Sequence, residues 1–553
     1  MIPLVTATQM RALDEETIAQ LGIAGGVLME TAGRGVISVL FDLHRQGRFD
    51  LRTAQVCVVA GPGNNGGDGM VIARYLHSHG IACDLWIVAL RPRIRGDALV
   101  HLAAAEAVGV TSHFCEAESP LLQQRLAALS PGDVLVDALL GTGVSRTVGG
   151  GLCTVITQIN ASRAITVSVD LPSGLDADRG IPIDAGPAPV IVRADYTVTF
   201  GFPKLGLCGS PGFVFAGETF VADIGIPAAR CAHHGVTAEL VSAQVMTPLQ
   251  SRRSPLGHKG SHGHLLCVAG SEGKLGAALL STEAALRTGV GLCTLAAARA
   301  ALDGSLGSRC PEAMTLPYDP QDKHALDQIL SALPGKTAVA AGPGLLPTQA
   351  TQELIIRLLA ADTLPMVLDA EALNQLVGTL DVVRQRSQHG GETVLTPHPG
   401  EAARLLGTTS AAVQADRIGA VRALADKTHA VVLLKGAKTL IARSHTSDTT
   451  GVTLAMIPTG NAAMGSGGMG DVLTGMIGAL LASGMHAFDA ACLAAYWHGL
   501  AGDVAATRKA PGSIVLATEV MQDLDEARKV GGTFASSQPS WPVWPLAWAA
   551  SRT

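Results

Sequence analysis

The sequence predicts an α/β protein in which helices wind around parallel sheets. Short β-branched runs alternate with helical patterns along most of the chain, which is typical of strand–helix–strand units. The composition agrees, because 48% of the 553 residues are hydrophobic, only 3% are aromatic and 64 are glycine. Small aliphatic residues and glycines favour tight turns between strands and helices. Because the length exceeds what one hydrophobic core serves, we expect two domains.

The first series of elements lies in residues 1–225. An amphipathic helix is expected first, in a segment that includes MRALDEETIAQ. Predicted strands then follow at residues 54–61, 83–90, 133–141, 164–174 and 195–201. The alternation is lost from Phe220 to Pro255, and we place a linker at residues 226–244.

A second series lies in residues 245–530 and shares no repeat with the first. Its predicted strands fall within residues 262–271, 337–345, 365–374, 392–406 and 430–442, and two long helical segments close it. Residues 531–553 are rich in proline and tryptophan and have no clear period, so we expect a poorly ordered tail. The chain therefore reads as a fusion of two different α/β domains.

Charge and hydropathy exclude several function classes. The net charge of -6, without a long basic run, predicts no nucleic-acid binding. Apolar runs are far shorter than the roughly 20 residues of a membrane helix, so no membrane association is expected. Ten scattered cysteines without a CxxC pair, and an N-terminus unlike a signal peptide, predict a cytoplasmic protein.

The N-terminal domain places polar residues where predicted strands end. AGPGNNGGDGMVIARYL follows a strand and opens a helix, and Asp137 and Asp170 end two further strands. Parallel strands present such residues in one crevice, where a carboxylate can transfer protons. Oxygens of Asn65, Asp137 and the turn at Ser173 could also hold a cation. The alternative for each aspartate is a capping role, which three glycine-flanked sites together disfavour.

GPGNNGGDG, VDALLGTG and VDLPSGLD resemble the NAD(P)H-hydrate epimerase family, the YjeF N-terminal domain, over residues 1–225. The resemblance implies a Rossmann-like three-layer fold and a potassium ion on Asn65, Asp137 and Ser173. Asp170 touches the substrate in this interpretation and is our candidate for the acid/base of epimerisation. The implied substrate-binding residues are Asn64, Asn65, Gly66, Gly67, Asp68, Gly141, Thr142, Gly143, Val144, Ser145, Arg146, Thr147 and Asp170.

In the C-terminal domain, the run GSGGMGDVLTG carries a lone acid, Asp471, directly before an apolar segment. Glycines at a helix N-terminus bring backbone N–H groups together into an anion-binding site, and phosphate is the anion expected to bind there. The run lacks the Gly-Lys-Ser/Thr ending of a P-loop. An acid beside phosphate is favourable only if it has chemistry to perform, such as taking a proton from a hydroxyl. The alternative is that Asp471 caps the helix.

Four segments together resemble the ADP-dependent NAD(P)H-hydrate dehydratase of the ribokinase-like superfamily, over residues 245–530. They are HKGSHGHLLCVAGSEGKLGAALLSTEAALRTGVG, TPHPGEAARLL, LLKGAKT and GNAAMGSGGMGDVLTG. The resemblance implies that the hydrate is bound by Ala277, Gly344, His398 and Asp471, and the nucleotide by Lys435, Gly436, Ala437, Lys438, Thr439 and Gly470. Both halves together resemble the bifunctional NAD(P)H-hydrate repair enzymes of the YjeF/Nnr type.

This resemblance implies metabolite repair. The first domain would epimerise the R- and S-hydrates of NADH and NADPH, and the second would dehydrate the S epimer at the expense of ADP. With Asp471 as base and Gly467–Gly470 steadying the phosphoryl group, the hydroxyl would become a phosphate ester that can leave. Mg²⁺ is the expected companion of ADP. We also expect a homo-oligomer.

Two other functions remain open from the sequence. A ribokinase-like small-molecule kinase would use the same glycine–aspartate loop and release a stable phosphorylated product. In the second, the N-terminal fold would be a non-catalytic nucleotide-binding or assembly module. The presence of the paired asparagines and the strand-end aspartates argues against the second alternative.

Overall fold

The computed structural model describes residues 2–143, 149–183, 190–249, 253–302, 309–320, 322, 324–361, 363–444, 451–536 and 543–545. The described chain divides into two compact units. An N-terminal unit comprises Pro3–Ala238 together with residues 543–545, and a C-terminal unit begins at Glu239. Strands β1 (Ile2–Leu4) and β9 (Ala238–Leu240) lie where the chain passes between the units.

A sheet in the order β19-β8-β7-β6-β5-β2-β3-β4 forms the middle of the N-terminal unit. All neighbours in it are parallel except β19, which runs antiparallel to β8. The strands are β2 (Val56–Ala60), β3 (Cys83–Ile87), β4 (Thr111–Phe114), β5 (Val134–Ala138), β6 (Ile165–Val169), β7 (Tyr196–Phe200), β8 (Glu218–Ala222) and β19 (Val543–Pro545).

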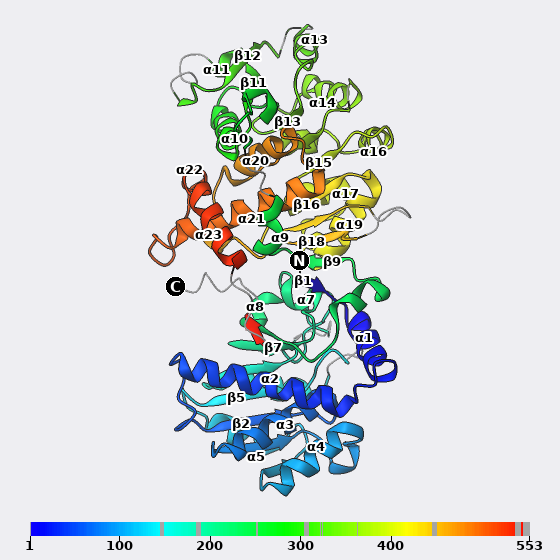
Figure 1. The fold of residues 1–553 in the computed structure, drawn as a ribbon, viewed down its shortest axis with the longest axis vertical. Coiled ribbons are helices and arrows are strands. Elements are labelled where there is room, and N and C mark those ends of the chain that lie inside the picture. The colour runs from blue at the N-terminus through cyan, green and yellow to red at the C-terminus, as the bar shows by residue number, and fades with distance from the viewer. Residues whose placement is uncertain are drawn as a thin grey trace. The chain divides into compact units, whose positions relative to one another are not determined.

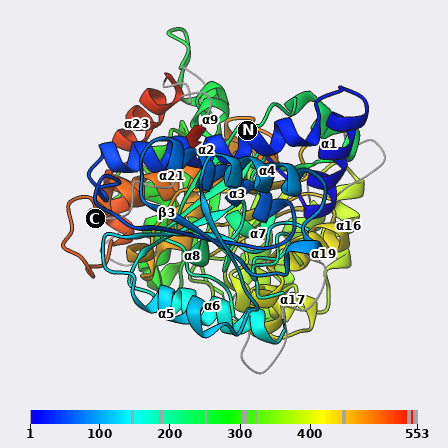
Figure 2. The same ribbon diagram turned by 90° about the horizontal axis from the view of Figure 1, so that it is seen from below.

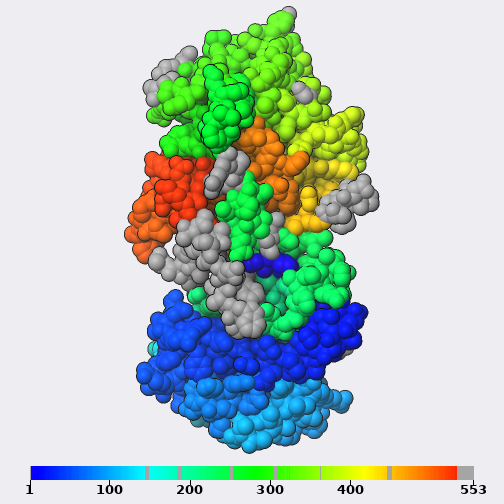
Figure 3. Space-filling model, viewed as in Figure 1, coloured from blue at the N-terminus to red at the C-terminus, as the bar shows by residue number. Residues whose placement is uncertain are grey.

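Helices cover both faces of this sheet. They are α1 (Ala7–Ala19), α2 (Gly25–Arg45), α3 (Asn64–Ser78), α4 (Gly96–Ala107), α5 (Pro120–Ala127), α6 (Gly151–Ala161), α7 (Leu205–Cys208) and α8 (Phe213–Ala216), with the 3-10 turns η1 (Arg91–Arg93) and η2 (Ala228–His234). Figure 2 shows α2, α3 and α4 on one side of the strands and α5 and α6 on the other. In the space-filling view, dark blue and light blue segments from the first part of the chain cover much of the visible face of this unit (Figure 3). The unit is therefore a three-layer α/β structure.

The central strands β2 and β5 are buried at every residue, because helices pack on both faces. Burial on both faces explains why these strands are continuous apolar runs in the sequence. Three strands of this sheet, β4, β8 and β19, are not revealed by the sequence pattern. All three are short; β8 begins just before Phe220, where the alternation is lost, and β19 lies in the segment expected to be a poorly ordered tail.

The C-terminal unit contains a larger sheet, whose order from β18 onward is β18-β17-β16-β15-β14-β13-β10-β11-β12. Pairing is parallel from β12 through β16 and antiparallel between β16, β17 and β18. The strands are β10 (His264–Val268), β11 (Leu292–Ala298), β12 (Met314–Tyr318), β13 (Ala338–Ala341), β14 (Met366–Leu368), β15 (Thr393–Leu395), β16 (Val431–Leu434), β17 (Leu440–Ala442) and β18 (Leu454–Met456).

Two long helices, α20 (Met469–Ala482) and α21 (Ala487–Ala506), pack on this sheet and form much of its core. Figure 1 shows the arrangement of the elements. The other helices are α9 (Ala243–Leu249), α10 (Leu275–Thr288), α11 (Arg299–Leu302), α13 (Ala325–Leu330), α14 (Gln349–Ala361), α15 (Glu371–Asn374), α16 (Asp381–Gln388), α17 (Pro399–Leu406), α18 (Ser410–Ala415), α19 (Arg417–Thr428), α22 (Ala517–Gln522) and α23 (Leu524–Ser536), with the 3-10 turns η3 (Lys259–His262) and η4 (Ala462–Met464).

The predicted α/β class is thus confirmed for both units. Alternate residues of β10, such as Leu265 and Cys267, belong to the core that α20 and α21 complete. In the described parts of the chain, no helix combines the length and the apolar character that a membrane crossing requires.

Candidate active sites

A pocket of about 500 Å³ opens at the carboxyl ends of β2, β5 and β6 in the N-terminal unit. Three connections meet there: the turn into α3, the turn after β5, and the turn that begins at Asp170. Parallel strands converge their following loops in this way, so residues from distant parts of the sequence share one crevice. The predicted site residues that line the pocket are Asn64, Asn65, Asp68, Gly141, Thr142, Gly143 and Asp170.

Glycine is needed in the turn between β2 and α3 because the backbone segments approach closely. A Cβ at Gly61 would lie 2.2 Å from the carbonyl oxygen of Leu139, and one at Gly66 would lie 1.8 Å from the carbonyl oxygen of Gly61. Gly67 packs against Met29, whose side chain lines the pocket. Gly66 and Gly67 therefore shape the turn rather than line the pocket. Val144, Ser145, Arg146 and Thr147 lie outside the described residues.

Asp170 forms an ion pair with Lys204, whose Nζ lies 2.5 Å from Asp170 Oδ1. Lys204 is only 1% exposed. Its ammonium group also donates to Thr199 Oγ1 and to the carbonyl oxygen of Phe200, both at 3.0 Å. These contacts use all three ammonium protons, so Lys204 is a fixed positive charge behind Asp170.

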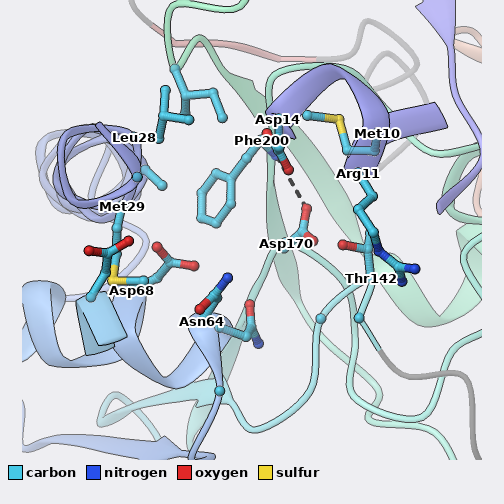
Figure 4. A pocket seen from close by; sticks show the side chains of 18 of the residues that line it. Met10, Arg11, Asp14, Leu28, Met29, Asn64, Asp68, Thr142, Asp170 and Phe200 are labelled. Carbon is cyan, nitrogen blue, oxygen red and sulfur yellow. Dashed lines mark hydrogen bonds between the residues drawn. The ribbon is translucent and has the colours of Figure 1, made fainter. Parts of the chain in front are cut away.

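Two further carboxyl groups, Asp14 on α1 and Asp68 on α3, line the same pocket. Figure 4 shows both with Asp170 around one cavity, beside Met10 and Phe200. Burial raises the pKa of Asp14 to about 6, an effect that Lys204 opposes and Asp170 reinforces. Burial and the charges of Asp170 and Asp14 also raise the pKa of Asp68 well above its usual range. The pocket thus combines carboxyl groups of different proton affinity.

Asp137 lies at the end of β5 and is fully buried. Its carboxylate accepts hydrogen bonds from Ser173 Oγ at 2.6 Å, from the Ser173 backbone N–H at 2.9 Å and from Ser168 Oγ at 2.9 Å. Burial raises the pKa of Asp137, while the hydrogen bonds from Ser173 lower it. No lysine or arginine in the described chain pairs with this carboxylate.

Asn65 is buried next to Gly141, and neither polar atom of its amide has a hydrogen-bond partner within the described chain. Buried amides normally find partners, so this one calls for an explanation. An oxygen-binding cation beside the Asn65 carbonyl and the Asp137 carboxylate would satisfy both groups. The residues therefore fit a potassium ion.

The C-terminal unit has a second pocket, of about 540 Å³. Ala277 from α10, Gly344 after β13, His398 after β15 and Asp471 from α20 all line it. These are the four residues expected to face the hydrate. Gly344 has a φ of 68°, and a Cβ there would lie 2.8 Å from the carbonyl oxygen of Lys274. Glycine is therefore required at this part of the wall.

Asp471 stands in the first turn of α20, where the helix N-terminus favours a negative charge. Burial nevertheless raises its pKa to about 6, with a further increase from Asp369 and a decrease from Lys435. Lys435 Nζ lies 2.5 Å from Asp369 Oδ1 and 3.7 Å from Glu401 Oε2. Burial opposes the charge on Lys435, but these two acids raise its pKa. Gly470 leaves room for the pair, because a Cβ there would lie 3.2 Å from Lys435 Nζ.

The other predicted nucleotide residues lie in the turn between β16 and β17. Thr439 Oγ1 donates to the carbonyl oxygen of Gly436 at 2.9 Å. Lys438 has a φ of 53°, and its buried Nζ donates to the carbonyl oxygen of Pro458 at 2.9 Å. Its side chain is therefore directed toward that carbonyl group, while the backbone of Gly436 and Ala437 completes the turn.

His398 is the N-cap residue of α17. Its Nδ1 accepts a hydrogen bond from the Gly400 backbone N–H at 3.0 Å, and Glu401 in turn accepts from the His398 backbone N–H at 2.8 Å. The ring is half exposed and faces the pocket, so a ligand can reach its Nε2 side.

Comparison with known proteins agrees with both halves of this arrangement. Residues 25–206 match the family described as YjeF-related protein N-terminus, and residues 265–525 match the family described as NAD(P)H-hydrate dehydratase. A bifunctional NAD(P)H-hydrate repair enzyme of Moorella thermoacetica is 41% identical over 92% of this chain and 93% of its own length. The chain belongs to the family of bifunctional NAD(P)H-hydrate repair enzymes.

Other members of the repair-enzyme family are similar as well. The Escherichia coli protein is 33% identical over 91% of this chain and 89% of its own length. An ADP/ATP-dependent NAD(P)H-hydrate dehydratase from Bacillus subtilis, co-crystallised with ATP/Mg²⁺, is 28% identical over 52% of this chain and 97% of its own, with a TM-score of 0.45.

Sequence reasoning missed several charged residues of this repair-enzyme chain. Asp369 directly follows β14, so the strand-end rule that selected Asp137 and Asp170 could have found it. Lys204 lies in the connection that follows β7, although not directly at the end of the strand. Asp14 had no such signal, because its position in the pocket depends on how α1 packs against the ends of distant strands.

Proposed function

We propose that this chain repairs hydrated nicotinamide cofactors in two steps. The N-terminal unit interconverts the R- and S-hydrates of NADH and NADPH. The C-terminal unit then restores NADH or NADPH from the S epimer at the expense of ADP. The observation that carries the proposal is the position of Asp471, a half-buried acid in the first turn of α20 that shares a pocket with the three other expected hydrate-binding residues.

The hydroxyl of the hydrate is a poor leaving group, and phosphorylation converts it into a phosphate ester that can leave. Asp471 accepts the hydroxyl proton as the oxygen attacks the terminal phosphorus of ADP, and AMP leaves. The backbone N–H groups of Gly467–Gly470 and the charge of Lys435 stabilise the transferred phosphoryl group. The C–O bond then breaks and its electron pair leaves with phosphate, while the neighbouring carbon loses a proton and the electrons of that C–H bond restore the ring double bond. Mg²⁺ accompanies the nucleotide phosphates in this proposal.

For the N-terminal unit we propose Asp170 as a proton-transferring group, with the substrate held by Asn64, Asp68 and the turn at Gly141–Gly143. Potassium would be held by Asn65, Asp137 and Ser173, where it would neutralise a buried carboxylate and fix the turn. A cytoplasmic location and a homo-oligomeric state remain predictions.

The test uses a mixture of NADH-hydrate epimers, ADP and Mg²⁺. We expect full recovery of NADH absorbance together with equimolar AMP and phosphate. A stable phosphorylated hydrate, or phosphorylation of another alcohol without recovery of NADH, would instead establish the small-molecule kinase alternative. Repeating the assay with ATP decides which nucleotide serves as donor, because ATP would yield ADP instead of AMP.

A further inference from the structure

The N-terminal pocket contains several side chains that can exchange protons, not only one aspartate. Asp14, Asp68 and Asp170 reach it from three different elements, and Lys204 lies behind Asp170 (Figure 4). One acid/base alone cannot both remove a proton from one atom and supply one to another at the same moment. The removal of one proton and the supply of another therefore require two different groups of the pocket.

The chemistry of the substrate defines which roles are needed. Water adds to an enamine double bond at the carbon next to nitrogen, so the hydrated carbon of the ring carries both the hydroxyl and the ring nitrogen. Such a carbon can invert by opening the ring. The hydroxyl loses its proton, its electron pair forms an aldehyde C=O bond, the C–N bond breaks, and the nitrogen receives that bond's electrons and a proton. Rotation of the aldehyde and reversal of the step give the other epimer, without an oxidant or other co-reactant.

We propose that Asp14 is the general acid that protonates the ring nitrogen, that Asp170 is the base that takes the hydroxyl proton, and that Lys204 positions Asp170. This inference rests on the proposed epimerase function. Lys204 does not itself supply the proton, because its three N–H groups are already donated to Asp170, Thr199 and Phe200.

Asp14 suits the acid role through its surroundings. Burial raises its pKa to about 6, close to the range in which a general acid is both protonated and able to release its proton. Asp68 is more deeply buried and retains its proton to higher pH, which fits a hydrogen-bond donor to substrate. The charged or titratable groups around Asp14 are Lys204, Asp170, Asp68, Asp97, Arg11 and Glu15.

The test follows the R epimer to the S epimer by direct separation, without ADP, so that dehydration does not interfere. Asp14→Asn should lower the epimerisation rate by about 10²–10⁴-fold, the usual contribution of a positioned acid. Glu15→Gln, an exposed neighbour on the same helix, should stay within about two-fold of wild type. An Asp14→Asn enzyme that is folded by circular dichroism and epimerises at the wild-type rate would overturn the assignment.

The pH profile of the wild type needs no variant and covers the case in which Asp14→Asn fails to fold. A required protonated Asp14 makes the rate fall as the pH rises through about 6. A rate that does not fall through this range would reject Asp14 as the acid. Asp68→Asn should raise KM yet keep this falling limb. Lys204→Met should lower kcat and move the falling limb to higher pH, because the charge of Lys204 lowers the pKa of Asp14. A lysine that serves only packing would leave the midpoint of that limb unchanged.

Oxygen-labelled water tests the ring opening itself. Epimerisation through loss and re-addition of water would exchange the hydroxyl oxygen at every turnover, whereas ring opening retains it at low conversion. Complete exchange per turnover would therefore reject the ring-opening step. If wild type does not epimerise at all, the proposed function fails first, which separates that failure from the failure of this assignment.

Discussion

At the residue scale, the proposed role of Asp471 predicts how the dehydration rate depends on pH. As a base it must be ionised, so the rate of ADP-dependent dehydration should rise as the pH increases through about 6. Asp471→Asn should lower kcat by about 10²–10⁴-fold with little change in the affinity for ADP. Asp489→Asn, an acid in the first turn of the neighbouring helix α21, is the matched control and should retain activity. Activity that stays high in Asp471→Asn would leave the residue with only a capping role.

A second prediction concerns Lys435, because its removal leaves the buried carboxylate of Asp369 without its ion-pair partner. Asp369 is 1% exposed and receives a hydrogen bond from Thr474 besides the ion pair with Lys435. Breaking a buried pair in this way costs about 3–5 kcal/mol. Lys435→Met should therefore lower the unfolding free energy of the C-terminal unit by that amount and weaken ADP binding. The exposed Lys427→Met should change neither quantity, and an unaltered Lys435→Met unfolding curve would show that Asp369 does not need the pair.

Sequence reasoning works best at the residue scale where a residue ends a strand. Asp137 and Asp170 could be placed in a crevice because parallel strands present their ends together. The two lysine ion pairs could not be derived from the sequence. Lys204 and its partner Asp170 are 34 positions apart, and Lys435 and its partner Asp369 are 66 positions apart. Their partners are decided by tertiary packing, which a local pattern does not encode.

At the element scale, the contact between α10 and α20 depends on a glycine. A Cβ at Gly475 would lie 2.0 Å from the Ser281 carbonyl oxygen, so Gly475→Ala must push the two helices apart. We expect a loss of about 1–3 kcal/mol. Gly276→Ala on α10 meets no atom within 4 Å and should be neutral or slightly stabilising. The unfolding transition of the C-terminal unit is identified as the one that ADP shifts to higher temperature. Equal unfolding midpoints for Gly475→Ala and Gly276→Ala would contradict the prediction.

The ends of β5 and β6 predict an effect of potassium on the N-terminal unit. A cation that binds the folded state at Asn65, Asp137 and Ser173, but not the unfolded chain, stabilises the folded state by an amount that grows with the logarithm of its concentration above the dissociation constant. Replacing K⁺ by tetramethylammonium, which is too large for such a site, should lower the thermal midpoint of this unit. Asp137→Asn should remove most of that dependence. Asp133→Asn, just before the opposite end of β5, should keep it, and a midpoint insensitive to the cation would exclude the site.

Element prediction was correct where a strand is central and failed where it lies toward the edge of a sheet. β2 and β5 are buried on both faces and therefore are apolar throughout. The residues of β4 are all at least partly exposed, so its sequence TSHF carries no comparable apolar run. No strand was expected in the tract of β11 and β12 either. Unlike β4, β11 is almost entirely buried, so exposure does not explain this miss, and its sequence LCTLAAA could have revealed it.

At the scale of the whole molecule, the separation of the two pockets into different units makes a final prediction. One pocket is built only from residues of the N-terminal unit and the other only from residues of the C-terminal unit. Asp170→Asn should therefore block epimerisation and leave dehydration of the S epimer intact, while Asp471→Asn should do the reverse. An equimolar mixture of the two variants should then recover NADH fully from mixed epimers, because the S-hydrate released by one molecule can diffuse to another. Recovery should slow as the mixture is diluted. If the mixture repairs only the S epimer, the hydrate must pass directly between the two units of one chain, and the pockets would not be independent.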